Sequence, residues 1–128
     1  MVRSNTASNL DLLSAGVRLF NAGHYFEAHE LWEDAWKRSE GPERLLYQGL
    51  IHAAAAMIHV RKGNLVGAKS QFGKCAARFD PLAPGFGGIA LDRLRRELRG
   101  FIDSCANGGE ADHQCPVIHS ANPGGAAN

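Results

Sequence analysis

The sequence lacks the features that identify membrane proteins, secreted proteins and nucleic-acid-binding proteins. Its uncharged stretch from Leu45 to Val60 is sixteen residues long and is interrupted by two histidines and a glutamine, whereas a membrane-spanning helix needs roughly 20 predominantly apolar residues. The first residues have no apolar core of a signal peptide. A formal net charge of +1 gives no general attraction to nucleic acid or to acidic lipid. We therefore expect a protein that binds neither a membrane nor nucleic acid, and a buried central helix at residues 45–60.

Cysteine is also scarce, and the cysteines present follow no pairing pattern. Cys75, Cys105 and Cys115 are odd in number and contain no Cys-x-x-Cys pair, which excludes the common zinc and thiol-redox motifs. This usage favours a reducing compartment, so we expect a cytoplasmic protein. The nucleophile elbow, the phosphate-binding glycine loop and the dinucleotide fingerprint are absent as well. The sequence thus gives no sign of covalent catalysis and leaves open whether the protein is an enzyme.

Apolar residues recur at helical spacing along most of the chain, and no segment alternates like a β-strand. Glycine and proline mark the breaks, and Ser8 or Asn9 can cap the first helix. The segments expected to be helical lie between these breaks: residues 9–22, 25–38, 42–62 and 64–79, then a fifth helix after residue 88. The fold class predicted is all-α, a compact bundle of about five helices built from two helical hairpins plus a C-terminal helix.

The chain divides into three parts by composition. Residues 1–8 are expected to form a flexible N-terminus and residues 9–104 the helical bundle domain. Residues 105–128 are rich in glycine, alanine, asparagine and proline. Such a segment buries too little apolar surface to offset the entropy lost on ordering. We therefore predict a disordered C-terminal tail.

A faint internal repeat supports the two hairpins. The pattern Gly23-x-Tyr-x-x-Ala28 aligns with Gly63-x-Leu-x-x-Ala68, and further on Trp32 aligns with Phe72. Each glycine ends one helix and starts the next, and the small alanine allows the paired helices to approach closely. The pattern resembles half of a tetratricopeptide-type hairpin. One functional hypothesis is therefore a tetratricopeptide-like protein-interaction module without chemistry of its own.

The segment from Gly23 to Trp36 is the best candidate for a site because it carries more polar and aromatic residues than a simple helix needs. At about 100° per residue, its apolar arc includes Trp32 and Trp36, and His29 and Glu33 lie side by side at the edge of that arc. On the next helix, three polar side chains project within roughly 40° of one another. These three are Gln48, His52 and His59.

If these two helices pack together, their polar residues meet in one pocket. The residues expected to bind a ligand are His29, Glu30, Glu33, Trp36, Gln48 and His59. A divalent metal would be held by His29, Glu33 and His59, because imidazole and carboxylate groups on facing helices form metal sites in bundles. A buried hydrogen-bond network that fixes the helix register is the structural alternative. A small molecule, a divalent cation and a protein partner all stay open, as does assembly into a homo-oligomer.

Three blocks of sequence carry a family resemblance: residues 20–36, residues 47–59 and residues 63–68. Together they resemble the signature of the family catalogued as domain of unknown function 309. The resemblance spans residues 13–98 and implies a small, single-domain helical bundle without an established activity. The family commonly has glutamine where this chain has His52. That difference moves the emphasis to the positions of the family pattern that this chain keeps, among them His29, Glu30, Glu33 and His59.

Overall fold

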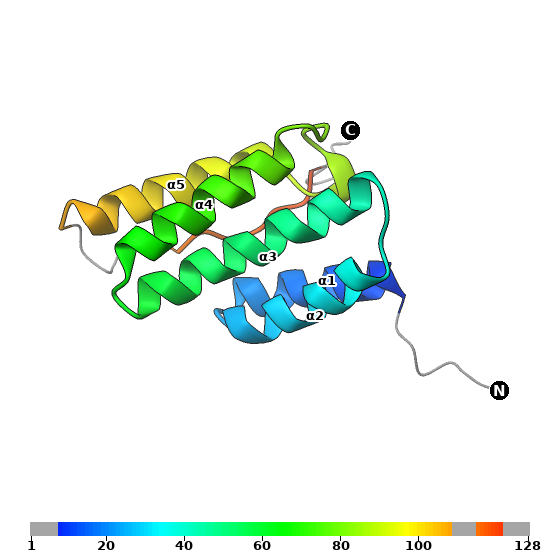
Figure 1. The fold of residues 1–128 in the computed structure, drawn as a ribbon, viewed down its shortest axis with the longest axis horizontal. Helices are drawn as coiled ribbons and strands as arrows, with labels where there is room; N and C mark the ends of the chain where they lie inside the picture. The colour runs from blue at the N-terminus through cyan, green and yellow to red at the C-terminus, as the bar shows by residue number, and fades with distance from the viewer. Residues whose placement is uncertain (1–7, 109–114, 122–128) are drawn as a thin grey trace.

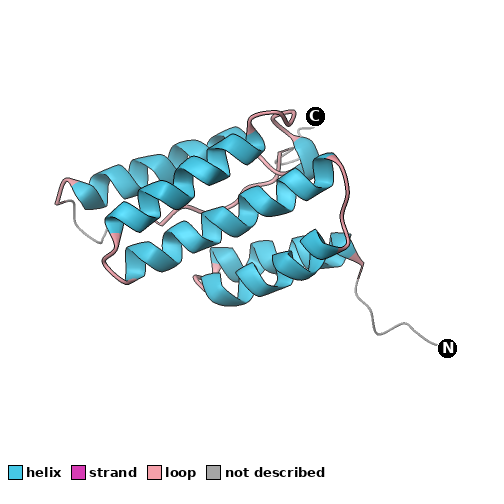
Figure 2. Ribbon diagram, in the orientation of Figure 1, coloured by secondary structure: helices cyan, strands magenta, loops and turns pink. Residues whose placement is uncertain are grey.

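The computed structural model describes residues 8–108 and 115–121. In these residues the chain forms five α-helices joined by loops, with one short 3-10 turn and no strand (Figure 2). The elements are α1 (Asn9–Asn21), α2 (Tyr25–Lys37), α3 (Pro42–Arg61), α4 (Leu65–Phe79), η1 (Phe86–Gly88) and α5 (Leu91–Ala106). This confirms the predicted all-α bundle. Within the same residues, no helix is both long enough and apolar enough to cross a membrane.

Helix α3 lies at the centre of the bundle (Figure 1). The α1–α2 hairpin packs on one side of it, and α4 packs on the other side with α5 behind. Leu50, Ala53, Ala54 and Ala56 of α3 are fully buried. The alanines leave little side-chain volume between helices, so both neighbours of α3 pack close to its backbone. The expectation of a buried central helix over residues 45–60 is therefore met.

Two glycines let aromatic rings lie directly against a helix backbone. A Cβ added at Gly16 of α1 would lie 2.2 Å from Nε1 of Trp32 on α2, and one added at Gly49 of α3 would lie 2.3 Å from the ring of Phe79 on α4. Trp32 also donates from Nε1 to the Leu13 carbonyl at 3.4 Å. Both rings are almost fully buried, so each hairpin unit is fixed by an aromatic side chain of the following helix.

The two hairpin turns have the same backbone geometry. Gly23 and Gly63 adopt φ angles of 86° and 74°, a region in which only glycine is free of strain. The residue after each glycine donates its N–H to a carbonyl five positions back, at 2.8 Å in the first turn and 2.9 Å in the second. Ala28 and Ala68 are both fully buried. The pseudo-repeat found in the sequence thus corresponds to a repeated structural turn.

The C-terminal residues 115–121 differ from the sequence prediction, which places them in a disordered tail. They form an extended segment that runs behind α3 and lies packed on the bundle (Figure 1). Pro116 and Ile118 are buried. The Asn21 side chain accepts from the Ile118 N–H at 2.7 Å and donates to the Ile118 carbonyl at 2.9 Å.

The prediction failed here because the average composition of the tail conceals the short apolar run Pro116-Val117-Ile118. That run buries enough surface, with backbone hydrogen bonds on both edges, to hold the segment in place. Helix α5 also continues two residues past the predicted domain end, to Ala106. The other parts of the predicted flexible ends, residues 1–7, 109–114 and 122–128, lie outside the described residues.

Candidate functional site

The polar edge of α2 carries the pair on which the sequence prediction centres. His29 and Glu33 are one turn apart, and Nδ1 of His29 lies 3.9 Å from a carboxylate oxygen of Glu33. That separation is too long for a hydrogen bond. Nδ1 is nevertheless buried and has no hydrogen-bond partner in the described part of the chain. A buried polar atom without a partner is rare and needs a physical explanation.

Helix α3 brings a second histidine to the same face. Nδ1 of His52 lies 2.7 Å from the Oε1 atom of Gln71 on α4. Because an amide oxygen only accepts, His52 donates from Nδ1 and its Nε2 carries the lone pair. The antiparallel register that pairs His59 with Asn64 beside the hairpin turn also pairs His52 with Gln71.

The electrostatic surroundings keep the second histidine uncharged. Burial lowers the pKa of His52 below its ordinary value. The hydrogen bond to Gln71 opposes this shift, whereas the charges of Arg78, Lys74 and His29 add to it. At neutral pH the His52 ring is therefore a neutral hydrogen-bonding group. His29 on α2 is thus one of the groups whose charge acts on His52.

Two other predicted residues lie on the same two helices as this pair of histidines. Gln48 precedes His52 by one turn of α3, so both project on the same side of that helix, and both are half-buried. Glu30 follows His29 on α2 and is exposed. Phe26, one turn before His29, is 60% exposed, and its ring lies parallel to the imidazole at a centroid distance of 6.5 Å. The result is a polar surface with one exposed aromatic ring at its edge.

The remaining two predicted residues lie elsewhere. Nδ1 of His59 is 3.2 Å from the side-chain amide of Asn64, where α3 turns into α4, two turns beyond His52. Trp36 lies at the far end of α2, with the Arg44 guanidinium 4.2 Å from the centre of its ring. A projection onto an ideal helix places His59 on the same side of α3 as His52. It does not give the separation along the helix axis, and this separation keeps His59 out of the predicted pocket.

The predicted metal centre is accordingly not assembled. In the described part of the chain, no group of three or more histidine, cysteine, aspartate or glutamate residues is arranged to hold a metal ion. His29, Glu33 and His59 therefore do not form a shared ligand set. The sequence argument did not predict that His52 pairs with Gln71. This pairing follows from the register of the α3–α4 hairpin, which the glycine turn fixes.

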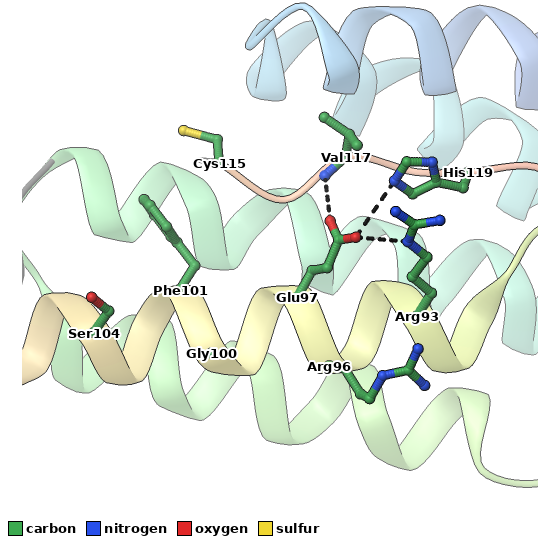
Figure 3. Close-up of a pocket in the computed structure, with 9 residues that line it drawn as sticks. All are labelled: Arg93, Arg96, Glu97, Gly100, Phe101, Ser104, Cys115, Val117 and His119. Atoms are coloured by element: carbon green, nitrogen blue, oxygen red, sulfur yellow. Dashed lines mark hydrogen bonds and ion pairs between the residues drawn. The ribbon is translucent and has the colours of Figure 1, made fainter. Parts of the chain in front are cut away.

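A second polar region lies between α5 and the segment 115–121, where the structure has a cavity of about 670 Å³ (Figure 3). Glu97 is one of the residues that line it. Its carboxylate accepts from Nε of Arg93 at 2.8 Å and from the Val117 N–H at 3.2 Å, and Nε2 of His119 lies 3.4 Å away. Partial burial raises the pKa of Glu97, but these hydrogen bonds and charges outweigh it and hold the pKa below its ordinary value. No sequence pattern pointed to this region.

The structure is thus a small protein of helical hairpins with a polar face that carries His29 and His52, called here the histidine-rich face. A comparison of the sequence with protein families gives a match. Residues 13–71 match the family described as "Domain of unknown function (DUF309)", which confirms the resemblance derived from the three sequence blocks. The matched residues include His29, Glu33, His52 and Gln71, whereas α5 and the segment 115–121 lie outside the match. Comparison with curated proteins gives no match.

Proposed function

We propose that this protein binds a small, uncharged, hydroxylated molecule at the face formed by α2, α3 and α4. The observation that carries the proposal is the buried Nδ1 atom of His29, which has no hydrogen-bond partner among the described residues and lies 3.9 Å from Glu33. A hydroxyl group placed between these two groups could hydrogen-bond to both. The Glu33 side chain is 46% exposed, so its carboxylate is free to turn and admit such a group.

The charges around this face support a neutral ligand. Glu30 and Glu33 disfavour an anion, and Lys74 and Arg78, whose charges reach His52, disfavour a cation. The lone pair on Nε2 of His52 and the Glu33 carboxylate both accept hydrogen bonds, so the ligand must supply donors. Hydroxyl groups do this without adding charge.

The exposed Phe26 ring narrows the ligand class further. It lies beside His29 and offers an apolar surface next to the polar groups. Small-molecule sites commonly combine an apolar wall with a few placed polar groups. A cyclic polyol, such as a monosaccharide, has both an apolar C–H face and a ring of hydroxyls. The proposed site therefore consists of His29, Glu33 and His52, with Phe26, Glu30 and Gln48 at its edge.

The family match supports this location, because the matched residues carry the whole of the proposed site. His59 and Trp36 are not part of the proposal, since they contact Asn64 and Arg44 instead. No metal ion and no catalytic step are included. The cytoplasmic location inferred from the cysteine pattern is retained as part of the proposal.

Saturation-transfer NMR with glucose as the probe tests this function, with ethanolamine and acetate as charged comparisons. We expect saturable transfer to glucose only. His29→Asn and His52→Gln should each weaken it about tenfold, because each removes one directed hydrogen bond. Asp34→Asn, at an exposed position of α2, is the matched control and should bind as the unchanged protein does. Absence of transfer to glucose, or equal losses in the control, would contradict the proposal.

A second candidate function is peptide binding, in keeping with the tetratricopeptide-like alternative. The observation that favours it is the segment 115–121, which the bundle already holds in an extended conformation through Asn21 and Glu97. The surface of the bundle that holds this segment would accept a similar segment from another chain once its own segment is displaced.

A synthetic peptide with the sequence of residues 115–121 tests this candidate. Ile118→Asp in the full chain should weaken the hold on its own segment while leaving the residues of that surface unchanged. We expect the peptide to bind this variant and not the unchanged protein. A peptide carrying the same Ile-to-Asp change is the control and should not bind. Failure of the unmodified peptide to bind the variant would rule this function out.

A further inference from the structure

The cavity between α5 and the segment 115–121 has a charged end and an end that carries an aromatic ring. At one end, Arg93 and His119 face Glu97 (Figure 3). Toward the other end, the lining includes Phe101, Ser104 and Cys115. Side chains on one face of a single helix and an extended segment opposite it thus border a space of about 670 Å³, which lies within the usual size range of small-molecule sites.

The charged end has an excess of positive charge. Glu97 is already bound to Arg93 and to the Val117 N–H, so its negative charge is used to hold the segment. Arg96 also lines the cavity, is exposed, and forms no ion pair within residues 8–108 and 115–121. Because Arg93 is paired with Glu97, the Arg96 guanidinium leaves one positive charge at the lining of the cavity. This favours a ligand with a single negative charge.

From these observations we propose that the cavity binds an amphipathic monoanion, a carboxylate attached to a short apolar or aryl group. The carboxylate pairs with Arg96, whose planar guanidinium matches a carboxylate with two parallel hydrogen bonds. The apolar group lies against the Phe101 ring. This site is separate from the histidine-rich face and does not depend on the function proposed there.

Gly100 provides a direct way to close the cavity. It lines the cavity on α5, and a Cβ added there would meet no atom within 4 Å. A leucine at this position therefore projects into free space, and it also favours the helix, since glycine costs about 1 kcal/mol relative to better helix formers. Gly100→Leu should fold normally while its side chain occupies the ligand space. Gly73 of α4 is likewise exposed, with no neighbour within 4 Å of an added Cβ, and serves as the matched control.

Phenylbutyrate is a suitable probe, with phenylbutanol and phenylbutylamine as neutral and cationic analogues of the same shape. The measurement is a titration of the full-length protein followed by the backbone amide NMR shifts of α5 and of residues 115–119. We expect saturable shifts with phenylbutyrate, and binding about tenfold weaker for the alcohol, because it lacks the charge-assisted hydrogen bonds. The amine should be weaker still.

The variants then locate the site. Gly100→Leu should abolish binding without lowering the melting temperature, and Gly73→Leu should leave binding intact. Arg96→Ala should weaken phenylbutyrate about tenfold and bring it to the level of the alcohol, whereas Arg99→Ala, at an exposed position of the same helix, should have no such effect. Equal binding of the three analogues, no saturable shift, or equal losses in the Arg96 and Arg99 variants would overturn the proposal.

Discussion

The two polar regions of this bundle differ in how the chain assembles them. The histidine-rich face is built from α2, α3 and α4, which follow one another along the chain. The cavity region depends on the segment 115–121, whose Ile118 is held by a residue 97 positions earlier, Asn21. In the first region local helix geometry brings the polar groups together. In the second, a long-range contact has to form first.

This difference also separates the energetic roles of the two regions. The His29–Glu33 pair is loosely arranged and partly exposed, so it contributes little to stability. The segment 115–121 buries an isoleucine and is bound by several directed hydrogen bonds. We therefore expect substitutions in the segment to cost stability and substitutions on the histidine-rich face to affect binding instead.

Ile118→Ala should show the largest loss of stability. The side chain is only 5% exposed, and truncation of a buried isoleucine costs about 2–5 kcal/mol. We expect the lower end of that range, because the segment can detach without unfolding the helices. Urea unfolding measures the change. Val66→Ala, at an 83% exposed position, should change the free energy of unfolding by less than about 0.5 kcal/mol.

Asn21→Ala should have a smaller effect with the same origin. It removes both side-chain hydrogen bonds to the Ile118 backbone, at about 0.5–1.5 kcal/mol each. Hydrogen exchange provides the local readout: the Ile118 amide should lose about tenfold or more of its protection. An unchanged exchange rate would mean that the amide clamp does not hold the segment.

The two regions should also respond to acid in different pH windows. Hydrogen bonds lower the pKa of Glu97 below its ordinary value of 4.5. The folded state therefore releases this proton more readily than the unfolded state, and the resulting stability is lost as the pH falls below that value. Protection of the Val117 amide should decline in this window, and Glu97→Gln should remove the dependence. A decline that persists in the variant would exclude Glu97 as its cause.

His52 affects the stability of the fold at a higher pH than Glu97 does. Burial lowers its pKa below the ordinary value of 6.5, so the unfolded chain binds this proton at a pH where the folded chain does not. Stability should therefore fall as the pH drops below 6.5 toward the folded pKa. Urea unfolding of His52→Gln should show a weaker pH dependence than the unchanged protein over this window. Identical slopes would contradict the neutral, buried state of His52.

The sequence predicts well those features that depend on residue spacing within one or two helices. Gly23 and Gly63 fix the turns, Ser8 caps α1 as expected, and the stacking of His29 on Glu33 follows from helical periodicity. The placement of His59 failed because a helical projection contains no information on axial distance. The pairing of His52 with Gln71 required the register between two helices, which periodicity alone does not give.

The cavity could not be predicted for a different reason. Arg93, Arg96 and Glu97 have the pattern of a solvated helix face, and nothing in α5 itself indicates that a distant segment covers it. The short run from Pro116 to Ile118 is the only local signal, and it lies in a tail of otherwise disordered composition. Contacts of this kind follow from the packing of the whole chain.

The most direct test of the account is the stability of a double variant, His29→Asn with Glu33→Gln, measured by urea unfolding at neutral pH without ligand. If these residues serve binding, the free energy of unfolding should change by less than about 0.5 kcal/mol while glucose binding is lost. A loss of about 2 kcal/mol or more, the size expected for a buried hydrogen-bond network, would show that the pair serves the fold and would contradict the proposed site.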